Sequence, residues 1–166
     1  NIGSANKSRR TLSQDDVIGT SIIYPEADYL LNVGTIKGSV IDENSKPVFG
    51  AQVVAVNFDG VIVASVLTGV EKKDSNNIPT SYTSSSGDFY INGLPPDLYN
   101  LYVEPLDGPP AGATNFGFFE VNNINLNFNT TRFSHAVVVD PGKVTIGVDI
   151  QVSALNQDAP NIDVIS

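Results

Sequence analysis

Few side chains in this 166-residue chain could do chemistry, and the most suggestive are Ser134 and His135. A serine and a histidine can act as nucleophile and base when their side chains meet. The residues around them predict a strand, in which neighbouring side chains point to opposite faces. We therefore expect no catalytic dyad here. His135 is the single histidine and there is no cysteine, so a zinc site or a disulfide within this chain is not expected either.

Acidic residues could hold a hard cation. Asp42, Glu43 and Asn44 follow one another, and together with Asp107 they offer the oxygen ligands that calcium prefers. Their spacing does not match a calcium-binding loop. We therefore expect no cofactor in this chain and keep calcium as the alternative.

Asparagines alternate with apolar residues between positions 123 and 129. This period of two predicts a strand with an apolar inner face and an amide outer face. Such a face is either a hydrated surface or a binding surface, because amides form hydrogen bonds with sugars. The candidate binding residues are Asn123, Asn125, Asn127 and Asn129.

The formal net charge of −9 restricts the partners. Nucleic acids and anionic membranes attract clustered Lys and Arg, so we expect neither as a partner. No apolar run approaches the roughly 20 residues that a membrane helix needs, which argues against membrane insertion. The first residue is not Met, and we expect the chain to be a piece of a longer protein.

The elements that would position these residues are mostly strands. Alternation and turn signals predict strands near 34–42, 51–58, 61–68, 89–92, 99–103, 133–139 and 144–152. The polar residues 69–79 predict a loop, and Asp140-Pro141-Gly142 predicts a hairpin between the last two strands. Val144, Ile146, Val148, Ile150 and Val152 are expected on one face. The fold class is therefore all-β, an Ig-like or transthyretin-like Greek-key β-sandwich of about seven to nine strands with one short N-terminal α-helix.

One face of this sandwich should be unusually apolar. Val54, Val56, Phe58 and Ile62 point away from the inward residues of their strands, although a solvated sheet face is normally polar. We expect a cover over them, either the helix at 14–23 or the segment 115–132.

The middle of the chain resembles the carboxypeptidase regulatory-like domain, a transthyretin-like β-sandwich. The residues that carry the resemblance are Gly38, Val40, Asp42, Pro47, Val48, Gly50, Ala51, Val53, Gly87, Phe89, Ile91, Gly93, Leu94, Pro95, Tyr99, Leu101 and Val103. Asp97 stands where that pattern has a turn glycine. The resemblance implies a non-catalytic module, at 34–154, of the kind appended to peptidases and bacterial surface proteins. Residues 155–166 are then a linker or tail.

A short helix is expected at about 14–23. Ser13 and Asp16 form a partial capping box, and Ile18 and Ile22 share one face at i, i+4 spacing. Pro25 ends the helix. It could simply cap the following sandwich.

The residues Leu12, Ser13, Gln14, Asp15, Asp16, Val17, Gly19, Tyr24 and Pro25 also resemble the last helix of matrixin-type zinc metalloproteases. The resemblance implies that 1–31 is the tail of an upstream protease domain, which would hold the zinc and be the partner within one polypeptide. It also implies that Asp15 and Asp16 support the floor of that active site.

These expectations combine into one functional hypothesis. The chain would be a non-catalytic accessory β-sandwich of a secreted bacterial matrixin-like zinc metalloprotease, stabilising the protease or binding its substrate or a cell surface. The alternative is a stand-alone extracellular adhesion module that binds protein or carbohydrate. In both cases the location is secreted or at the bacterial cell surface.

Overall fold

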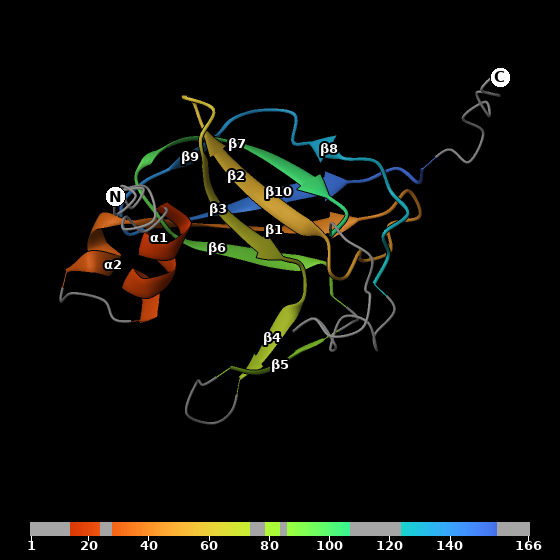
Figure 1. The fold of residues 1–166 in the computed structure, drawn as a ribbon, viewed down its shortest axis with the longest axis horizontal. Coiled ribbons are helices and arrows are strands. Elements are labelled where there is room, and N and C mark those ends of the chain that lie inside the picture. The colour runs from red at the N-terminus through yellow and green to blue at the C-terminus, as the bar shows by residue number, and fades with distance from the viewer. Residues whose placement is uncertain (1–13, 24–27, 74–78, 84–85, 107–123, 156–166) are drawn as a thin grey trace, which may run out of the picture.

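A computed structural model of the chain describes residues 14–23, 28–73, 79–83, 86–106 and 124–155 (Figure 1). The elements within them are α1 (Gln14–Ile23), α2 (Tyr29–Asn32), β1 (Gly34–Ile41), β2 (Gln52–Asn57), β3 (Ile62–Leu67), β4 (Val70–Lys73), β5 (Pro79–Thr83), β6 (Asp88–Leu94), β7 (Asp97–Glu104), β8 (Thr131–Arg132), β9 (Val137–Val139) and β10 (Val144–Gln151).

Eight of these strands form two layers. Sheet A has the order β10-β1-β6, and sheet B has the order β3-β2-β7, with β8 and β9 both paired to β7. In Figure 1 the two sheets face one another across a shared interior. The chain changes sheet between β1 and β2 and again between β6 and β7. The predicted all-β sandwich is therefore confirmed.

The core follows from the alternation in the strands. Ile36 and Val40 of β1 are fully buried, as are Val53 of β2 and Leu101 of β7. Gly38 lies where a Cβ would stand 1.9 Å from the carbonyl oxygen of Val148, so only glycine lets β1 and β10 approach this closely.

Two predictions about the loops are wrong. Residues 69–79 were expected to form a loop, but β4 lies within them and pairs with β5 as an antiparallel hairpin. Residues 123–129 were expected to form a strand, but the described part of this segment is extended with one bridge, between Phe128 and Ala154. Its alternation is as predicted, since Phe128 is buried and the flanking asparagines are exposed.

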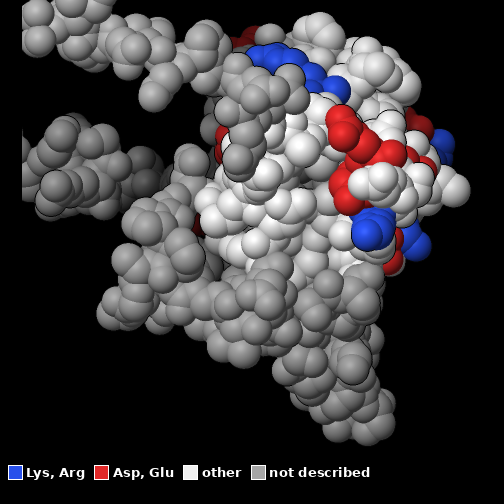
Figure 2. All heavy atoms as spheres, turned by 90° about the vertical axis from the view of Figure 1, so that its right-hand side faces the viewer, with Lys and Arg blue, Asp and Glu red and all other residues white. Residues whose placement is uncertain are grey.

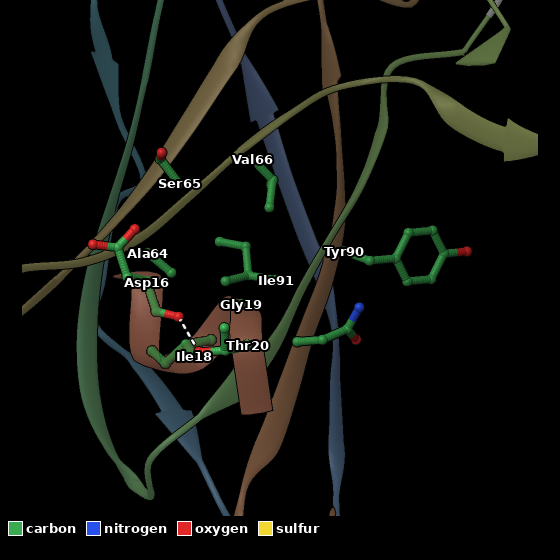
Figure 3. A pocket seen from close by; sticks show the side chains of 10 residues that line it. Asp16, Ile18, Gly19, Thr20, Ala64, Ser65, Val66, Tyr90 and Ile91 are labelled. Carbon is green, nitrogen blue, oxygen red and sulfur yellow. Dashed lines mark hydrogen bonds between the residues drawn. The ribbon is translucent and has the colours of Figure 1, made fainter. Parts of the chain in front are cut away.

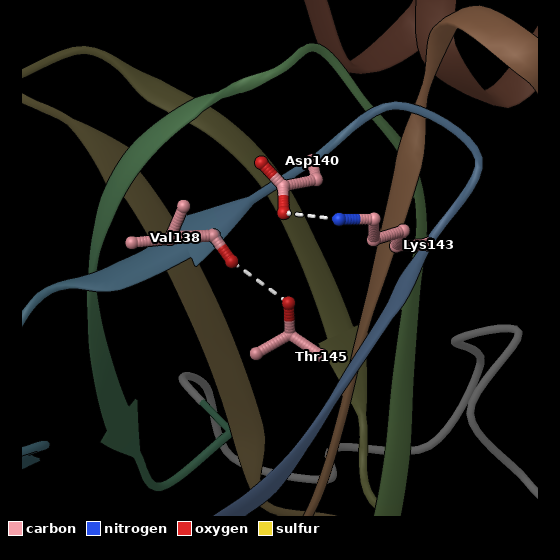
Figure 4. A network of polar contacts seen from close by, with 4 residues as sticks. All are labelled: Val138, Asp140, Lys143 and Thr145. Atoms are coloured by element: carbon pink, nitrogen blue, oxygen red, sulfur yellow. Dashed lines mark hydrogen bonds and ion pairs between the residues drawn. The ribbon is translucent and has the colours of Figure 1, made fainter.

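The predicted hairpin of β9 and β10 is also wrong. β9 pairs with β7 in sheet B, whereas β10 pairs in parallel with β1 in sheet A. The turn at Asp140–Gly142 therefore carries the chain from one sheet to the other. The Thr145 hydroxyl donates a hydrogen bond to the carbonyl oxygen of Val138 across this corner, at 2.7 Å (Figure 4).

A bulge in β10 shifts its pairing register against β1 by one residue. Ile36 pairs with Thr145 and Gly38 with Val148, so Ile146 and Gly147 together lie opposite Lys37. Gly147 has a φ of 81°, which glycine adopts without strain. The expectation that Ile146 shares the inward face of Val148 is wrong, because Ile146 is 72% exposed.

α1 closes one side of the sandwich. It contacts β3 and β6, the strands at the neighbouring edges of sheets B and A. Ile18 is 6% exposed and belongs to the same buried cluster as Ala64 and Ile91. α1 therefore caps the open edge and does not cover the outer face of β2.

Candidate functional site

One hollow lined by described residues is a groove of about 450 Å³ between α1, β3 and β6 (Figure 3). Ile18, Ala64 and Ile91 supply its apolar lining. Thr20 and Ser65 contribute hydroxyl groups. Tyr90 lines the margin, and Figure 3 shows its ring pointing away from the groove. The groove is shallow and mixed in polarity, which suits a contact surface better than a reaction site.

Asp16 contributes a carboxylate to the described residues that line this groove. It is exposed, and it lies in the first turn of α1 close to Ala64 and Ser65 (Figure 3). The Thr20 hydroxyl donates to its backbone carbonyl oxygen. Asp15 also lies on α1, but its side chain is outside the described residues. The predicted supporting role of Asp15 and Asp16 in a protease domain stays a prediction.

The asparagine face is partly used to hold the chain in place. The Asn125 side-chain oxygen accepts a hydrogen bond from the backbone amide of Asn127 at 2.9 Å. The Asn129 amide nitrogen donates to the carbonyl oxygen of Ala154 at 3.1 Å. Asn123 lies outside the described residues. Asn125, Asn127 and Asn129 are exposed, so they are open to a ligand, but they surround no described hollow.

The expectation that Ser134 and His135 cannot meet is wrong. They lie at a bend between β8 and β9, and Ser134 Oγ is 2.8 Å from His135 Nδ1. The histidine ring also packs on Phe133, with 4.5 Å between centroids. Both residues are exposed, and no carboxylate bonds to His135 within the described part of the chain. A hydrolytic triad needs such an orienting group, so this pair resembles a surface hydrogen bond.

Asp42, one of the residues considered as calcium ligands, holds the turn after β1. Asp42 Oδ1 accepts hydrogen bonds from the backbone amides of Asn44 and Lys46, at 2.8 and 2.9 Å. Asp107 lies outside the described residues. Across the described ranges no group of three or more His, Cys, Asp or Glu side chains is arranged to hold a metal ion.

The surface charge is mixed. Figure 2 views the right-hand side of Figure 1 and shows acidic side chains beside single basic ones, with no broad basic area among the described residues on that face. No helix in the described part of the chain is long and apolar enough to cross a membrane.

No protein-family model and no curated protein matches this sequence. Solved structures with a similar arrangement include the minor pilin GBS52 of Streptococcus agalactiae, with a TM-score of 0.40 and 14% identity over 76% of this chain and 47% of that chain. The major pilin subunit BcpA of Bacillus cereus has a TM-score of 0.39 and 16% identity, covering 74% and 30%. The Bacillus anthracis TIE protein has a TM-score of 0.38 and 16% identity, covering 74% and 17%.

The chain thus spans less than half the length of each of these three solved chains. Likenesses this distant carry no conclusion about ligand or partner. The β-sandwich itself rests on the strands and pairings described above.

The polar residues of the groove were not found from the sequence. Thr20, Ser65 and Asn92 come from three elements and have no spacing in common. Their proximity depends on where α1 packs against β3 and β6, and no local sequence pattern predicts that position.

Proposed function

We propose that this chain is a non-catalytic accessory β-sandwich of a secreted bacterial protein. The observation that carries the proposal is the composition of the interior. Among the described residues the buried side chains are apolar except for Thr68, and the Thr68 hydroxyl accepts from the amide of Ala51 and donates to the carbonyl oxygen of Val48. A catalytic group needs a partly dehydrated place beside its substrate, and the described part of the interior holds no buried charged side chain.

The first candidate for the longer protein that contains this chain is a matrixin-like zinc metalloprotease; this longer protein is called the parent below. The resemblance of residues 12–25 to the last helix of that family supports it, and the resemblance of 38–103 to a domain appended to peptidases agrees. In this proposal the upstream catalytic domain holds the zinc, and the sandwich stabilises it or engages its substrate or a cell surface.

The coding sequence upstream of this chain gives the direct test. The proposal requires a His-Glu-x-x-His-x-x-Gly-x-x-His stretch, because two histidines one helical turn apart and a third further on bind the zinc. A parent without such a stretch removes the protease from the proposal. The isolated chain should not cleave casein with zinc added. Cleavage that disappears in His135→Ala would contradict the non-catalytic assignment.

A stand-alone adhesion module is the second candidate. The burial of Ile18 in the core favours it, because α1 then belongs to the sandwich and not to another domain. Arrays of glycans and matrix proteins test this candidate. Binding that is lost when Asn125, Asn127 and Asn129 are replaced together by Ala would support it, and unchanged binding would exclude the amide face.

A further inference from the structure

β3 is an edge strand whose sequence does little to prevent pairing with another strand. Within the described residues it has a strand neighbour on one side only, which is β2. Its residues Ile62–Leu67 include no charge, no proline and no glycine. The register with β2 shifts at Val63 and is unbroken from Ala64 to Leu67. A regular apolar edge of this kind readily accepts a further strand.

The other sheet edges carry features that discourage pairing. β6 holds Asp88 and has a bulge at Asn92 and Gly93. β10 holds Asp149 and has the bulge at Gly147. β8 and β9 are only two and three residues long. Charges, bulges within a strand and short lengths all hinder strand addition, so β3 is the edge best suited to it.

α1 occupies the place beside this edge. Ile18 belongs to the same buried cluster as Ala64, and Gly19 lines the same groove as Ala64, Ser65 and Val66 (Figure 3). The backbone groups of a helix bond within the helix, so a helix cannot continue the hydrogen-bond ladder of a sheet. α1 therefore shields the edge of β3 without extending sheet B.

α1 is held to the sandwich by few contacts. Ten residues are too few for a helix that is stable alone in water, and Gly19 lowers the helix propensity of its interior. Among the described side chains of α1, Ile18 is the buried one, whereas Val17 is 45% exposed. Elements with few buried contacts open before the rest of a fold. We therefore expect α1 to open before the sheets separate.

A second copy of the chain supplies a strand that fits this edge. Residues directly opposite in an antiparallel pair share a face. With Ser65 on a two-fold axis, Ala64 of each copy lies opposite Val66 of the other, and both residues pack on the core side of sheet B. No charge of one β3 then meets a charge of the other. The same strand serves both copies, which is the geometry of an isologous contact.

We propose that β3 is the surface through which two copies of this chain join their B sheets, and that α1 is the removable cover that controls this pairing. The inference goes beyond the proposed function and does not depend on the parent. The apparent affinity of the copies is reduced by the fraction of molecules in which α1 is closed, so releasing α1 should strengthen self-association.

Sedimentation of the chain and of variants in α1 and β3 tests the inference. Ile18→Asp removes the buried anchor of α1 and should tighten self-association about tenfold or more. The matched control is Val17→Asp, which adds the same charge at an exposed residue of the same helix and should leave self-association unchanged. Ile18→Asp combined with Ser65→Lys should be monomeric, because two lysines would lie opposite one another across the axis.

A folded Ile18→Asp protein that associates no more tightly than the unsubstituted chain overturns the inference. Association that Val17→Asp strengthens equally, or that Ser65→Lys leaves intact, also overturns it. Assemblies larger than a dimer contradict it as well, because two-fold pairing is complete with two copies.

If circular dichroism shows that Ile18→Asp has lost its sheets, two milder variants decide. Self-association should strengthen in Ile18→Ala and weaken about threefold in Gly19→Ala, which stabilises the helix. Equal association in these two variants overturns the inference.

Discussion

The outer faces of the two sheets show different chemistry on equally regular strands. On sheet A, polar side chains meet across strands. Ser39 Oγ donates to Asp149 Oδ1 at 2.7 Å, and Thr35 Oγ1 donates to the Asn92 side-chain oxygen at 3.1 Å. On sheet B, the corresponding outward positions of β2 hold Val54 and Val56, and Val54 is 1% exposed.

This difference separates a face whose outward side chains are mostly polar from a face whose outward side chains are mostly apolar, some buried, as at Val54, and some exposed, as at Ile62. β1 alternates between apolar inward and mostly polar outward residues, as expected for a strand with one solvated side. β2 carries the apolar run Val53–Val56, as expected for a strand that is covered on both sides. Val144 and Ile146 are apolar exceptions on sheet A, and they lie on its edge strand.

The largest expected effect comes from placing a carboxylate on the covered face. Val54→Asp should lower the free energy of unfolding by about 3 kcal/mol or more, since Val54 is 1% exposed and burial there removes a carboxylate from water. Asn92→Asp, at an exposed position on the polar face where the new carboxylate still accepts from the Thr35 hydroxyl, should change it by less than about 1 kcal/mol. Urea unfolding followed by circular dichroism measures both. Similar losses would mean that the two faces do not differ in hydration.

The next effect tests the bulge that turns Ile146 outward. Gly147→Ala should cost about 1 kcal/mol, because its φ of 81° is unfavourable for alanine although a Cβ there would meet nothing within 4 Å. Gly19→Ala in α1 is the matched control, since its Cβ would also meet nothing and its φ is not positive. It should stabilise the chain by about 0.5–1 kcal/mol through helix propensity. Urea unfolding should show changes in the free energy of unfolding of opposite sign for the two variants. A Gly147→Ala protein as stable as the unsubstituted chain would show that the bulge is unstrained.

The strands that sequence reasoning identified are those with local alternation. β1, β2, β3, β6 and β7 were predicted within a few residues, and so was the inward direction of Ile36 and Val40. The parallel pairing of β1 with β10 was not predicted. The residues Asp140-Pro141-Gly142 have the same turn chemistry in a hairpin and in a crossing between sheets. β4 and β5 lie in a polar stretch without periodicity.

The candidate surfaces were also predicted only as far as local alternation allows. Alternation predicted that Asn125, Asn127 and Asn129 would be exposed, but could not show that the Asn125 and Asn129 side chains bond to backbone atoms. The contact of Ser134 with His135 depends on a bend that has no local signal. Phe58 was recognised as outward-facing, but its neighbours Leu98 and Val138 depend on register between strands far apart in sequence.

Alkaline titration should distinguish tyrosines by their surroundings. Burial, and then the Asp97 carboxylate, raise the pKa of Tyr99 to about 12, from an ordinary 10.0. Burial, and then Glu104, raise the pKa of Tyr102 on the outer face of sheet B, while Arg132 lowers it. Between the unfolded and folded pKa values the native state keeps a proton that the unfolded chain has lost, so stability present below about pH 10 falls as the pH rises.

Ultraviolet difference absorbance of the folded chain should therefore show late ionisation that diminishes in Tyr102→Phe and again in Tyr99→Phe. Urea unfolding on either side of pH 10 should show the loss of stability, with a smaller loss in Tyr99→Phe. If Tyr102→Phe removes an early-ionising phenol instead, the outer face of sheet B is hydrated at that position.

The smallest expected effect lies on the polar face. Lys37 points outward from β1, and its Nζ lies 5.2 Å from the centroid of the Tyr90 ring. A cation over an exposed ring contributes about 0.5 kcal/mol, so Lys37→Ala should lower the free energy of unfolding by about that amount. Tyr90→Ala and the double variant complete a thermodynamic cycle in which the pair energy is the departure from additivity. A pair energy well above 1 kcal/mol would indicate that water is excluded around Tyr90, and the polar face of sheet A would then resemble the covered face of sheet B.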